Sequence, residues 1–394
     1  MSNSMKDLYS SPELDRKEYI EVDSNDQTLR KELGNRTDAE SARIKRYLAM
    51  DDLSRKDGSP IKEIADRVKA LDTFKKFDVI TIPEIVPMVQ TFDLFDFPAS
   101  HPARSKSDTY YVNEEYILRT HTTVMWWYYF NRPEVKEKMA KGLDMAVICH
   151  GKVYRKDEID RRHMNIFHQV DGLYICKKSE KEINQEDLKD VLIEVAQSVF
   201  GKEIKYRFNP DTFPYTHDSL EMEVDKDGQW VEVLGAGVVQ GSVLEKLGVD
   251  SNIYNGWAFG FGLERLAIIS MELPDIRLLW SDDERVTKQL KLGQKFVEVS
   301  KFPPVVRDIS FVVTNDFLPN DYFDLVRENA PGLVEQVELL DKYENAAKFG
   351  EGKVSYAYRV TYRSLEKTLT SEEVDALHKG LEKVTAETYN ATIR

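Results

Sequence analysis

The chain has 394 residues, 41% of them hydrophobic and 31% charged, a composition typical of globular proteins with more than one domain. Its formal net charge is −14, whereas most nucleic-acid binders are basic overall. A local stripe of basic residues is still compatible with this charge. No apolar run reaches the roughly 18 residues that cross a bilayer, and the N-terminus has no apolar signal region. Two cysteines, Cys149 and Cys176, are too few for a disulfide framework, so we predict two buried thiols.

The chain begins with a polar, charge-dense segment. Residues 1–58 predict a helical extension that packs on the main body or is partly disordered. A helix follows in SPIKEIADRVKALDTF, because Ser59 can cap its start and Pro60 fits its first turn. From 78 to 130, short β-rich runs alternate with proline-marked loops.

Many charges gather in YRKDEIDRRHMNIFHQVDG, residues 154–172. This stretch predicts the end of a strand, a charged loop and a returning antiparallel strand. Alternation on the return strand puts Phe167, Gln169 and Asp171 on one face, where the carboxylate suits an ammonium group. Arg155 projects from the first strand, and its planar fork suits phosphate. We therefore predict a site for an anionic ligand.

The same stretch has two other interpretations. A zinc site is disfavoured, because His163 and His168 would lie on opposite faces of a strand and no cysteine or third histidine completes the ligand set. A solvent-exposed hairpin with incidental charges remains open on these residues alone.

The clearest helix spans residues 184–200, where apolar side chains from Leu188 to Phe200 form one stripe. The strands SLEMEVD and QWVEVLGAG follow, joined by the hairpin turn DKDG. Residues 256–272 then predict a glycine-rich strand that leads into a helix carrying Arg265. Since glycines let a ligand approach the backbone closely, Arg155 and Arg265 could clamp one polyphosphate from both ends.

The C-terminal part is predicted as a separate unit after a linker at residues 285–300. It runs strand, helix, strand, strand, helix, optionally closed by a final strand, which suits a ferredoxin-like split βαβ domain. In the part before the linker, strands and helices do not alternate regularly. We therefore predict an antiparallel-rich α+β core rather than a doubly wound sheet.

Four segments in chain order resemble the class II aminoacyl-tRNA synthetases in their phenylalanyl form. VYRKDEID with FHQVDG resembles motif 2, and GWAFGFGLERLAI resembles motif 3. FDLFDFPASHPARSKSDTYY and the following LRTHTT resemble the phenylalanyl signature. FPPVVRDISFVV resembles the start of the ferredoxin-fold anticodon-binding domain. The resemblance covers the chain from about residue 60 to its end, and it is strongest to the single-chain, mitochondrial-type form.

The resemblance implies an architecture and a reaction. The architecture is an extension at 1–58, a class II antiparallel-sheet catalytic domain at 59–284, the linker at 285–300 and a ferredoxin-like anticodon-binding domain at 301–394. The reaction is activation of L-phenylalanine with ATP and Mg²⁺, release of pyrophosphate, and transfer to tRNA(Phe). The form it resembles acts as a monomer without a separate β subunit. The compartment is expected to be the cytoplasm, or the mitochondrial matrix if a leader has been removed.

The resemblance also implies residue roles, in which Arg155 contacts the α-phosphate and Arg265 the far end of a bent ATP as the two catalytic residues. Further residues are expected on the ATP side: Asp157, Arg162, His163 and Phe167. Others are expected around the amino acid: His121, Thr123, Trp126, Gln169, Asp171, Phe213, Tyr215, Gly235, Gly237 and Ala258. The carboxylates expected to hold Mg²⁺ are Glu221 and Glu232.

Four positions depart from the residues usual in this family. Asp171 stands where glutamate is usual, and Tyr215 where phenylalanine is usual. Trp126 occupies a place often held by glutamine, and Thr123 replaces a common serine. Tyr215 adds a hydroxyl that needs a partner if it is buried. These changes leave the activation chemistry in place and bear on which amino acid is activated.

The last unit is not basic overall, but cations gather late in it. The resemblance makes Arg359, Arg363 and Lys367 the candidate tRNA contacts, and Tyr358 and Tyr362 are interleaved so that they could stack on unpaired bases. The alternative is a solvated edge strand.

Two rival functions stay open on sequence alone. One is a related class II synthetase for another large amino acid, with the difference carried by the four departing positions. The other is a non-catalytic paralogue that holds tRNA. The presence of both Arg155 and Arg265 argues against the second.

Overall fold

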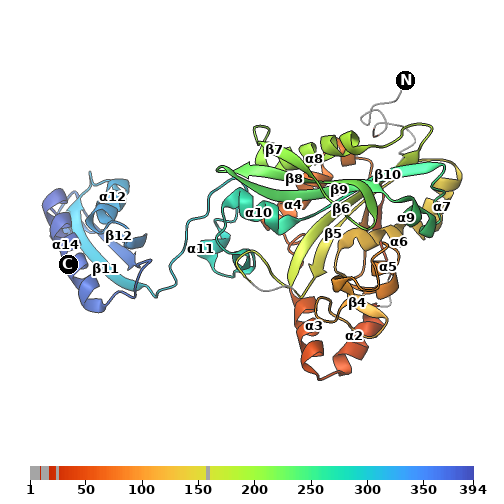
Figure 1. Ribbon diagram of the computed structural model, residues 1–394. Helices are drawn as coiled ribbons and strands as arrows, with labels where there is room; N and C mark the ends of the chain where they lie inside the picture. The colour runs from red at the N-terminus through yellow and green to blue at the C-terminus, as the bar shows by residue number, and fades with distance from the viewer. Residues whose placement is uncertain (1–8, 10–16, 24–25, 157–159) are drawn as a thin grey trace. The chain divides into compact units, whose positions relative to one another are not determined.

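The computed structural model describes Tyr9 and residues 17–23, 26–156 and 160–394. The chain forms two compact units, Met1–Phe296 and Val297–Arg394 (Figure 1). Each unit has its own hydrophobic core.

Unit 1 is built on an eight-stranded sheet in the order β1-β2-β5-β6-β10-β9-β8-β7. The pairs β1–β2 and β2–β5 are parallel and all others are antiparallel. The strands are β1 (Tyr19–Glu21), β2 (Asp78–Thr81), β5 (Met145–Tyr154), β6 (Ile166–Lys177), β7 (Tyr206–Pro210), β8 (Thr216–Lys226), β9 (Gln229–Val239) and β10 (Tyr254–Gly262). The predicted α+β class with an antiparallel-rich sheet is confirmed. Because β1 joins the sheet, the segment before residue 59 is part of this unit rather than an appendage.

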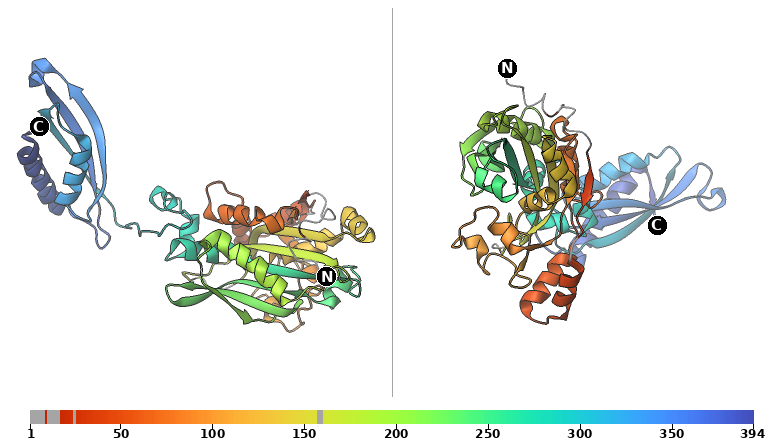
Figure 2. Two further views of the ribbon diagram at one scale, coloured as in Figure 1. Left: turned by 90° about the horizontal axis from the view of Figure 1, so that it is seen from above. Right: turned by 90° about the vertical axis from the view of Figure 1, so that its right-hand side faces the viewer.

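Three helices pack together along this sheet (Figures 1 and 2). They are α4 (Pro60–Lys69), α8 (Gln185–Phe200) and α10 (Leu263–Met271). The predicted capping of α8 is present: Asn184 accepts from the Glu186 amide, and Asp187 completes a reciprocal capping box. Its apolar stripe is buried, and such packing against the rest of the protein supplies most of the stability of a helix.

Unit 1 also contains further helices, 3₁₀ turns and a small strand pair. The helices are α2 (Asp26–Asn35), α3 (Ala39–Ala49), α5 (Met88–Phe92), α6 (Met125–Phe130), α7 (Pro133–Ala140), α9 (Gly241–Lys246) and α11 (Glu284–Thr287). The 3₁₀ turns are η1 (Asp72–Phe74), η2 (Pro102–Arg104), η3 (Thr122–Val124) and η4 (Ile276–Trp280). A small antiparallel pair joins β3 (Ile85–Pro87) to β4 (Tyr116–Leu118). The hairpin between β8 and β9 turns at Asp227 and Gly228, whose φ angles of 53° and 83° match a type I′ turn.

Unit 2 is a four-stranded sheet in the order β12-β13-β11-β14, the strand order of a ferredoxin-like fold. Its strands are β11 (Val305–Thr314), β12 (Val334–Glu344), β13 (Lys353–Tyr362) and β14 (Thr392–Ile393). Its helices are α12 (Pro319–Asn329), α13 (Ala346–Phe349) and α14 (Ser371–Tyr389). The predicted ferredoxin-like unit with a closing strand is therefore confirmed.

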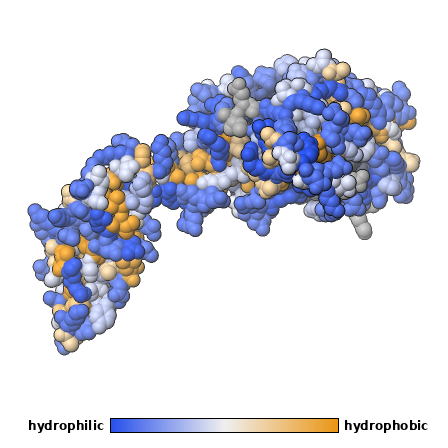
Figure 3. Space-filling view, turned by 90° about the horizontal axis from the view of Figure 1, so that it is seen from below, coloured by the Kyte–Doolittle hydropathy of each residue, from blue (hydrophilic) through white to orange (hydrophobic). Residues whose placement is uncertain are grey.

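The outer surface is mostly hydrophilic on the face drawn in Figure 3, with hydrophobic residues in small groups. Within the described ranges, none of the helices combines the length and apolar character needed to cross a membrane. Cys149 and Cys176 are both buried free thiols, as predicted.

Candidate active site

A cavity of about 480 Å³ opens beside the middle of the large sheet, lined by β6, β9, β10, the loops before η3 and β8, and the first turn of α10. Strand alternation on β6 places Phe167, Gln169 and Asp171 in its wall. The strand is paired with β5 on one edge and β10 on the other. These three side chains therefore project from a rigid element.

Two arginines reach this cavity from different elements. Arg155 follows β5, where its Nε donates to Thr120 O at 3.1 Å and its guanidinium lies 5.1 Å from the ring centre of Phe167, a cation–π distance. Arg265 lies in the first turn of α10, and its Nη1 is 3.1 Å from Glu232 Oε1. The cavity can therefore surround an anionic ligand with two guanidinium groups.

Asp171 is a buried carboxylate in the wall of the cavity. Thr123 Oγ1 donates to its Oδ1 at 2.7 Å, and Thr122 Oγ1 donates to its Oδ2. Burial raises the pKa of Asp171 to about 6, while the two threonine hydrogen bonds and the charge of Arg155 limit the rise. A cation beside it would be strongly favoured, because the charged carboxylate has lost much of its hydration.

Two acceptors in the same cavity have no hydrogen-bond partner among the described residues, His121 Nδ1 and Gln169 Oε1, although both atoms are buried. Burial and the charge of Arg155 lower the pKa of His121 to about 3, so its ring is neutral. Its Nε2 lies 3.3 Å from Thr91 O, which puts the proton on Nε2 and leaves Nδ1 as an acceptor. Buried polar atoms are rarely unpaired, so these two acceptors indicate a ligand with N–H or O–H donors.

An aromatic wall forms another side of the cavity. Phe213 and Tyr215 are stacked at 6.0 Å, and Phe97 lies nearly parallel to Tyr215 at 6.2 Å. Trp126 is fully buried behind this wall, with its ring perpendicular to Tyr215 at 6.1 Å. Contrary to the prediction, Trp126 is not among the residues lining the cavity, because its indole is used to support the Tyr215 ring from behind.

Glycines open space where side chains would collide. A Cβ on Gly260 would lie 2.7 Å from Asp171 Oδ1, and a Cβ on Gly235 would lie 3.0 Å from the Phe213 ring. These two positions keep the carboxylate and the aromatic wall accessible from the strands β10 and β9.

Most of the predicted ligand-contacting residues line this one cavity. They are Arg155, Arg162, His163, Phe167, Arg265, His121, Thr123, Gln169, Asp171, Phe213, Tyr215, Gly235, Gly237 and Ala258. Asp157 lies outside the described residues. Sequence reasoning missed Phe97, His101 and Glu264, which also line it. The signal for Glu264 was its place directly before Arg265, because it is an acidic residue in the first turn of a largely apolar helix.

Two carboxylates were predicted to hold a metal ion. Glu232 lines the cavity beside Arg265, whereas Glu221 does not line it. Glu221 on β8 is the register partner of Gly235 on β9, and its carboxylate accepts a hydrogen bond from Asn209 Nδ2 at 3.1 Å. The described part of the chain contains no cluster of three or more acidic, histidine or cysteine side chains that could hold a metal. Mg²⁺ carried by phosphates needs only one or two carboxylates, so this arrangement fits a metal that enters with its phosphates.

In unit 2, the three predicted tRNA-contacting cations are all paired with acidic side chains. Arg359 Nε is 2.9 Å from Asp308 Oδ1, and Arg363 Nε is 2.9 Å from Glu335 Oε2. Lys367 pairs with Glu373 in the same way.

The predicted stacking of Tyr358 and Tyr362 on bases is wrong. Both rings are fully buried in the core of unit 2, where Tyr358 packs on Phe311 and Tyr322. The alternation of β13 puts these tyrosines on the helix-covered face and Arg359 on the exposed face.

Two family models match the chain: the class II tRNA synthetase core domain (F) over residues 47–290, and the ferredoxin-fold anticodon binding domain over residues 300–394. The mitochondrial phenylalanine–tRNA ligase of Mus musculus is 36% identical over 339 residues, which is 77% of this chain and 72% of the relative. The chloroplastic/mitochondrial enzyme of Arabidopsis thaliana is 38% identical over 82% of this chain and 73% of its own. The mitochondrial enzyme of Saccharomyces cerevisiae is 30% identical over 84% and 86%, respectively.

Proposed function

Because the chain belongs to the class II phenylalanine–tRNA ligases of the single-chain, mitochondrial type, we propose that the cavity of unit 1 is where ATP activates L-phenylalanine. The reaction has two steps. The amino-acid carboxylate attacks the α-phosphorus of ATP and pyrophosphate leaves. A ribose hydroxyl of tRNA(Phe) then attacks the carbonyl carbon of the aminoacyl-adenylate, which forms the aminoacyl ester and releases AMP.

In the first step the substrate supplies its own nucleophile, so the protein must position the reactants and neutralise charge. We assign Arg155 to the α-phosphate and Arg265 to the far end of a bent ATP. Phe167 is assigned to stack on adenine. Its ring already has one planar group, the Arg155 guanidinium, over its face. Asp157 is proposed at the adenine end, with Arg162 and His163 near the phosphates.

The observation that carries this proposal is a set of three acceptors in one cavity: the Asp171 carboxylate, His121 Nδ1 and Gln169 Oε1. An ammonium group has three N–H donors, so it satisfies both unpartnered atoms and the buried charge at once. Thr123 holds Asp171 in place through its 2.7 Å hydrogen bond. The α-carboxylate of the same amino acid then faces Arg155.

The side chain of the amino acid is assigned to the aromatic wall. Phe213 and Tyr215 flank its ring, Ala258 shapes the far wall, and Gly235 and Gly237 form the floor. All five line the cavity, which supports this assignment.

We also propose that Mg²⁺ binds through Glu232 and Glu221 together with the phosphates. When bound, the ion neutralises phosphate charge and assists the departure of pyrophosphate. Glu232 is suited to this, because its present partner Arg265 is itself assigned to the phosphates.

For tRNA, we propose contacts from Arg359, Arg363 and Lys367. Arg359 and Lys367 form exposed ion pairs, which are weak in water, so an RNA phosphate can replace their carboxylates at small cost. The catalytic core and the anticodon-binding unit lie on one chain, which supports a monomer without a separate β subunit. The names of the relatives support a mitochondrial compartment.

ATP–pyrophosphate exchange with each standard amino acid in turn tests the proposed function. We expect the fastest exchange with phenylalanine and none above background with non-aromatic amino acids, because the aromatic wall and the three acceptors select an aromatic amino acid. Exchange with a different amino acid alone would contradict the substrate and implicate Asp171 and Tyr215. A folded protein that binds tRNA but exchanges with none would be a non-catalytic paralogue.

The pH dependence of phenylalanine activation follows from Asp171. Its pKa is raised to about 6, so below that pH the free enzyme holds a neutral acid that cannot attract an ammonium. We expect kcat/KM for phenylalanine to fall about tenfold for each pH unit below that pKa, and to be level above it. Exchange kinetics between mildly acidic and neutral pH would measure this, and a profile level down to pH 4 would contradict it.

A further inference from the structure

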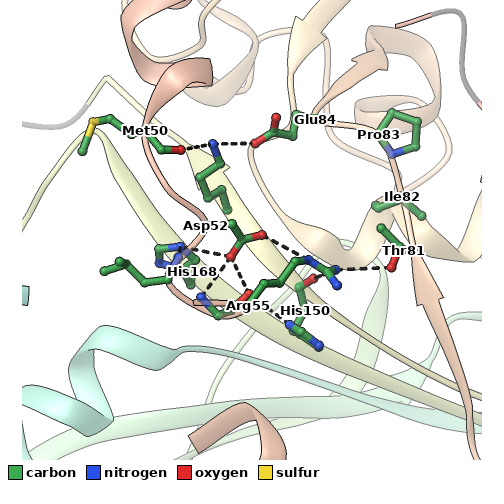
Figure 4. Close-up of polar contacts among 12 residues, drawn as sticks. Met50, Asp52, Arg55, Thr81, Ile82, Pro83, Glu84, His150 and His168 are labelled. Carbon is green, nitrogen blue, oxygen red and sulfur yellow. Dashed lines mark hydrogen bonds and ion pairs between the residues drawn. The ribbon is translucent and has the colours of Figure 1, made fainter. Parts of the chain in front are cut away.

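Charged side chains join the N-terminal segment at residues 50–55 to the large sheet. Figure 4 shows Asp52, His168 and Arg55 meeting beside the strands. His168 is fully buried. It lies between Phe167 and Gln169 on β6 and therefore points to the face of the sheet opposite theirs.

His168 is held from two sides. The Glu264 carboxylate accepts from the His168 backbone N–H at 2.8 Å and lies 2.5 Å from its ring Nδ1. The ring Nε2 lies 2.9 Å from Leu53 N and 3.3 Å from Asp52 Oδ1. A charged ring donates to Asp52 and a neutral ring accepts from Leu53. The imidazole therefore bridges Glu264 and the segment 50–55 in either form.

The segment is itself anchored, so it can act as a fixed support. Asp52 Oδ1 accepts from Ser54 N at 3.0 Å and from Ser54 Oγ at 2.6 Å. Arg55 Nη2 donates to His150 O at 3.1 Å. The buried Lys152 donates to Met50 O at 2.6 Å. Residues 50–55 are thus tied to β5 as well as to β6.

Of these bridging residues only Glu264 lines the cavity, and both His168 and Glu264 are neighbours in sequence of residues assigned to ligands. His168 is directly between Phe167 and Gln169, and Glu264 directly precedes Arg265. Buried ion pairs often add no more stability than apolar side chains of the same size would. A satisfied buried polar network does hold a single geometry.

We propose that Asp52, His168 and Glu264 form a positioning bridge that sets the first turn of α10 against β6, and so holds Arg265 and Phe167 at the separation that ATP requires. This inference rests on the proposed placement of ATP against those two residues. Asp171 is held separately by Thr122 and Thr123. Of the residues that adjoin the bridge in sequence, Phe167 and Arg265 are assigned to ATP and only Gln169 to phenylalanine, so the bridge is expected to affect ATP more than phenylalanine.

Asp52→Ala tests the bridge, with Asp51→Ala as the matched control. Asp51 is the adjacent acid, exposed and paired only with the exposed Lys56 among the described residues. We expect Asp52→Ala to raise KM for ATP in exchange about tenfold, the scale seen when a supporting partner of a functional ligand is lost. We expect KM for phenylalanine to change less than about twofold. Asp51→Ala should leave both constants near the wild-type values.

Two substitutions of His168 separate the ends of the bridge. In His168→Asn the amide lies where the ring Nδ1 was, so the contact with Glu264 is kept and the contact with residues 52 and 53 is lost. In His168→Gln the amide reaches the position of the ring Nε2, so the contact with residues 52 and 53 is kept. In the His168→Asn background the link to Asp52 is already absent, so adding Asp52→Ala should change KM for ATP less than about twofold. In the His168→Gln background, where the contact with Asp52 is kept, adding Asp52→Ala should still raise KM for ATP several-fold.

Failure of the positioning bridge and failure of the proposed ATP placement give different results. Equal KM for ATP in Asp52→Ala and Asp51→Ala would overturn the bridge, as would parallel losses in both KM values and in Tm, which indicate a purely structural role. If Asp52→Ala does not fold, Asp52→Asn removes the charge but keeps an acceptor oxygen, so it should raise KM for ATP by a smaller factor that still exceeds the effect of Asp51→Ala. If Phe167→Ala and Arg265→Ala also leave KM for ATP unchanged, the proposed ATP placement is what fails.

Discussion

Replacing Arg155 with alanine is expected to lower kcat/KM for phenylalanine-dependent ATP–pyrophosphate exchange by about 10³-fold. Negative charge builds on the α-phosphoryl oxygens as the substrate carboxylate attacks. The substrate itself supplies the nucleophile, so the contribution of the protein is to stabilise this charge. A guanidinium offers paired, planar donors to those oxygens. Its loss removes stabilisation that the transition state needs more than the bound substrates do, so most of the effect should fall on kcat.

The geometry explains why Arg155 has this role. Its Nε is committed to Thr120 O at 3.1 Å, which fixes the plane of the guanidinium over Phe167. Lysine carries its donors on one nitrogen and has no planar fork, so it cannot keep the contact with Thr120 O and also present paired donors to phosphate, and Arg155→Lys should recover only part of the lost rate. Arg43, an exposed arginine that pairs with Glu40 on α3, supplies the matched control. Arg43→Ala should exchange at the wild-type rate, and an Arg155→Ala enzyme within tenfold of wild type would contradict the assignment.

Replacing Asp171 with asparagine is expected to weaken phenylalanine activation by about 10²-fold or more while making the fold more stable. The activity falls because a neutral amide cannot offset the ammonium charge, and truncating one partner of a buried charge pair typically costs about 2–5 kcal/mol. The side chain keeps its size, and both threonine hydroxyls can still hydrogen-bond to it. Exchange kinetics with varied phenylalanine would show the loss as a rise in KM.

The stability gain has a definite sign and pH range. The folded protein binds the Asp171 proton more tightly than the unfolded chain does, because burial raises the pKa to about 6. The free energy of unfolding of the wild type therefore falls as pH rises from about 4 to about 6, by about 3 kcal/mol in total. Asparagine has no proton to lose, so the variant should be more stable than wild type by up to that amount near neutral pH and equal to it near pH 3.

Denaturant unfolding at several pH values checks this result. Asp190→Asn, an exposed position on α8, is the control for removing one carboxylate and should alter neither KM nor stability appreciably. An Asp171→Asn variant less stable than wild type near neutral pH would show that the carboxylate is better compensated than its burial implies.

Local patterns in the sequence predicted the elements well where one side of each element is buried. The helix α8 has both its apolar stripe and its Asn184 cap where the periodicity placed them. The alternation of β6 put Phe167, Gln169 and Asp171 on one face, and all three line the cavity. These features depend on neighbours within a few residues, which the sequence shows directly.

Alternation predicts which residues share a face but not which face is covered. Tyr358 and Tyr362 were expected on an RNA surface, and the helices of unit 2 cover them instead. Trp126 was expected to contact the amino acid, and it lies behind Tyr215. In each case the burial of a large ring depends on packing between elements, and nothing in the local pattern reports it.

The sequence by itself determined the α+β class, the division into a catalytic core and a ferredoxin-like unit, and the two arginines and strand face of the cavity. Only the tertiary structure decided how distant segments meet. It made residues 50–55 part of the support for β6 through Asp52 and His168, and it left His121 Nδ1 and Gln169 Oε1 as acceptors in one cavity. The physical reason is that periodicity and capping act over one or two turns, whereas these contacts depend on strand pairing and side-chain packing between residues far apart in the chain.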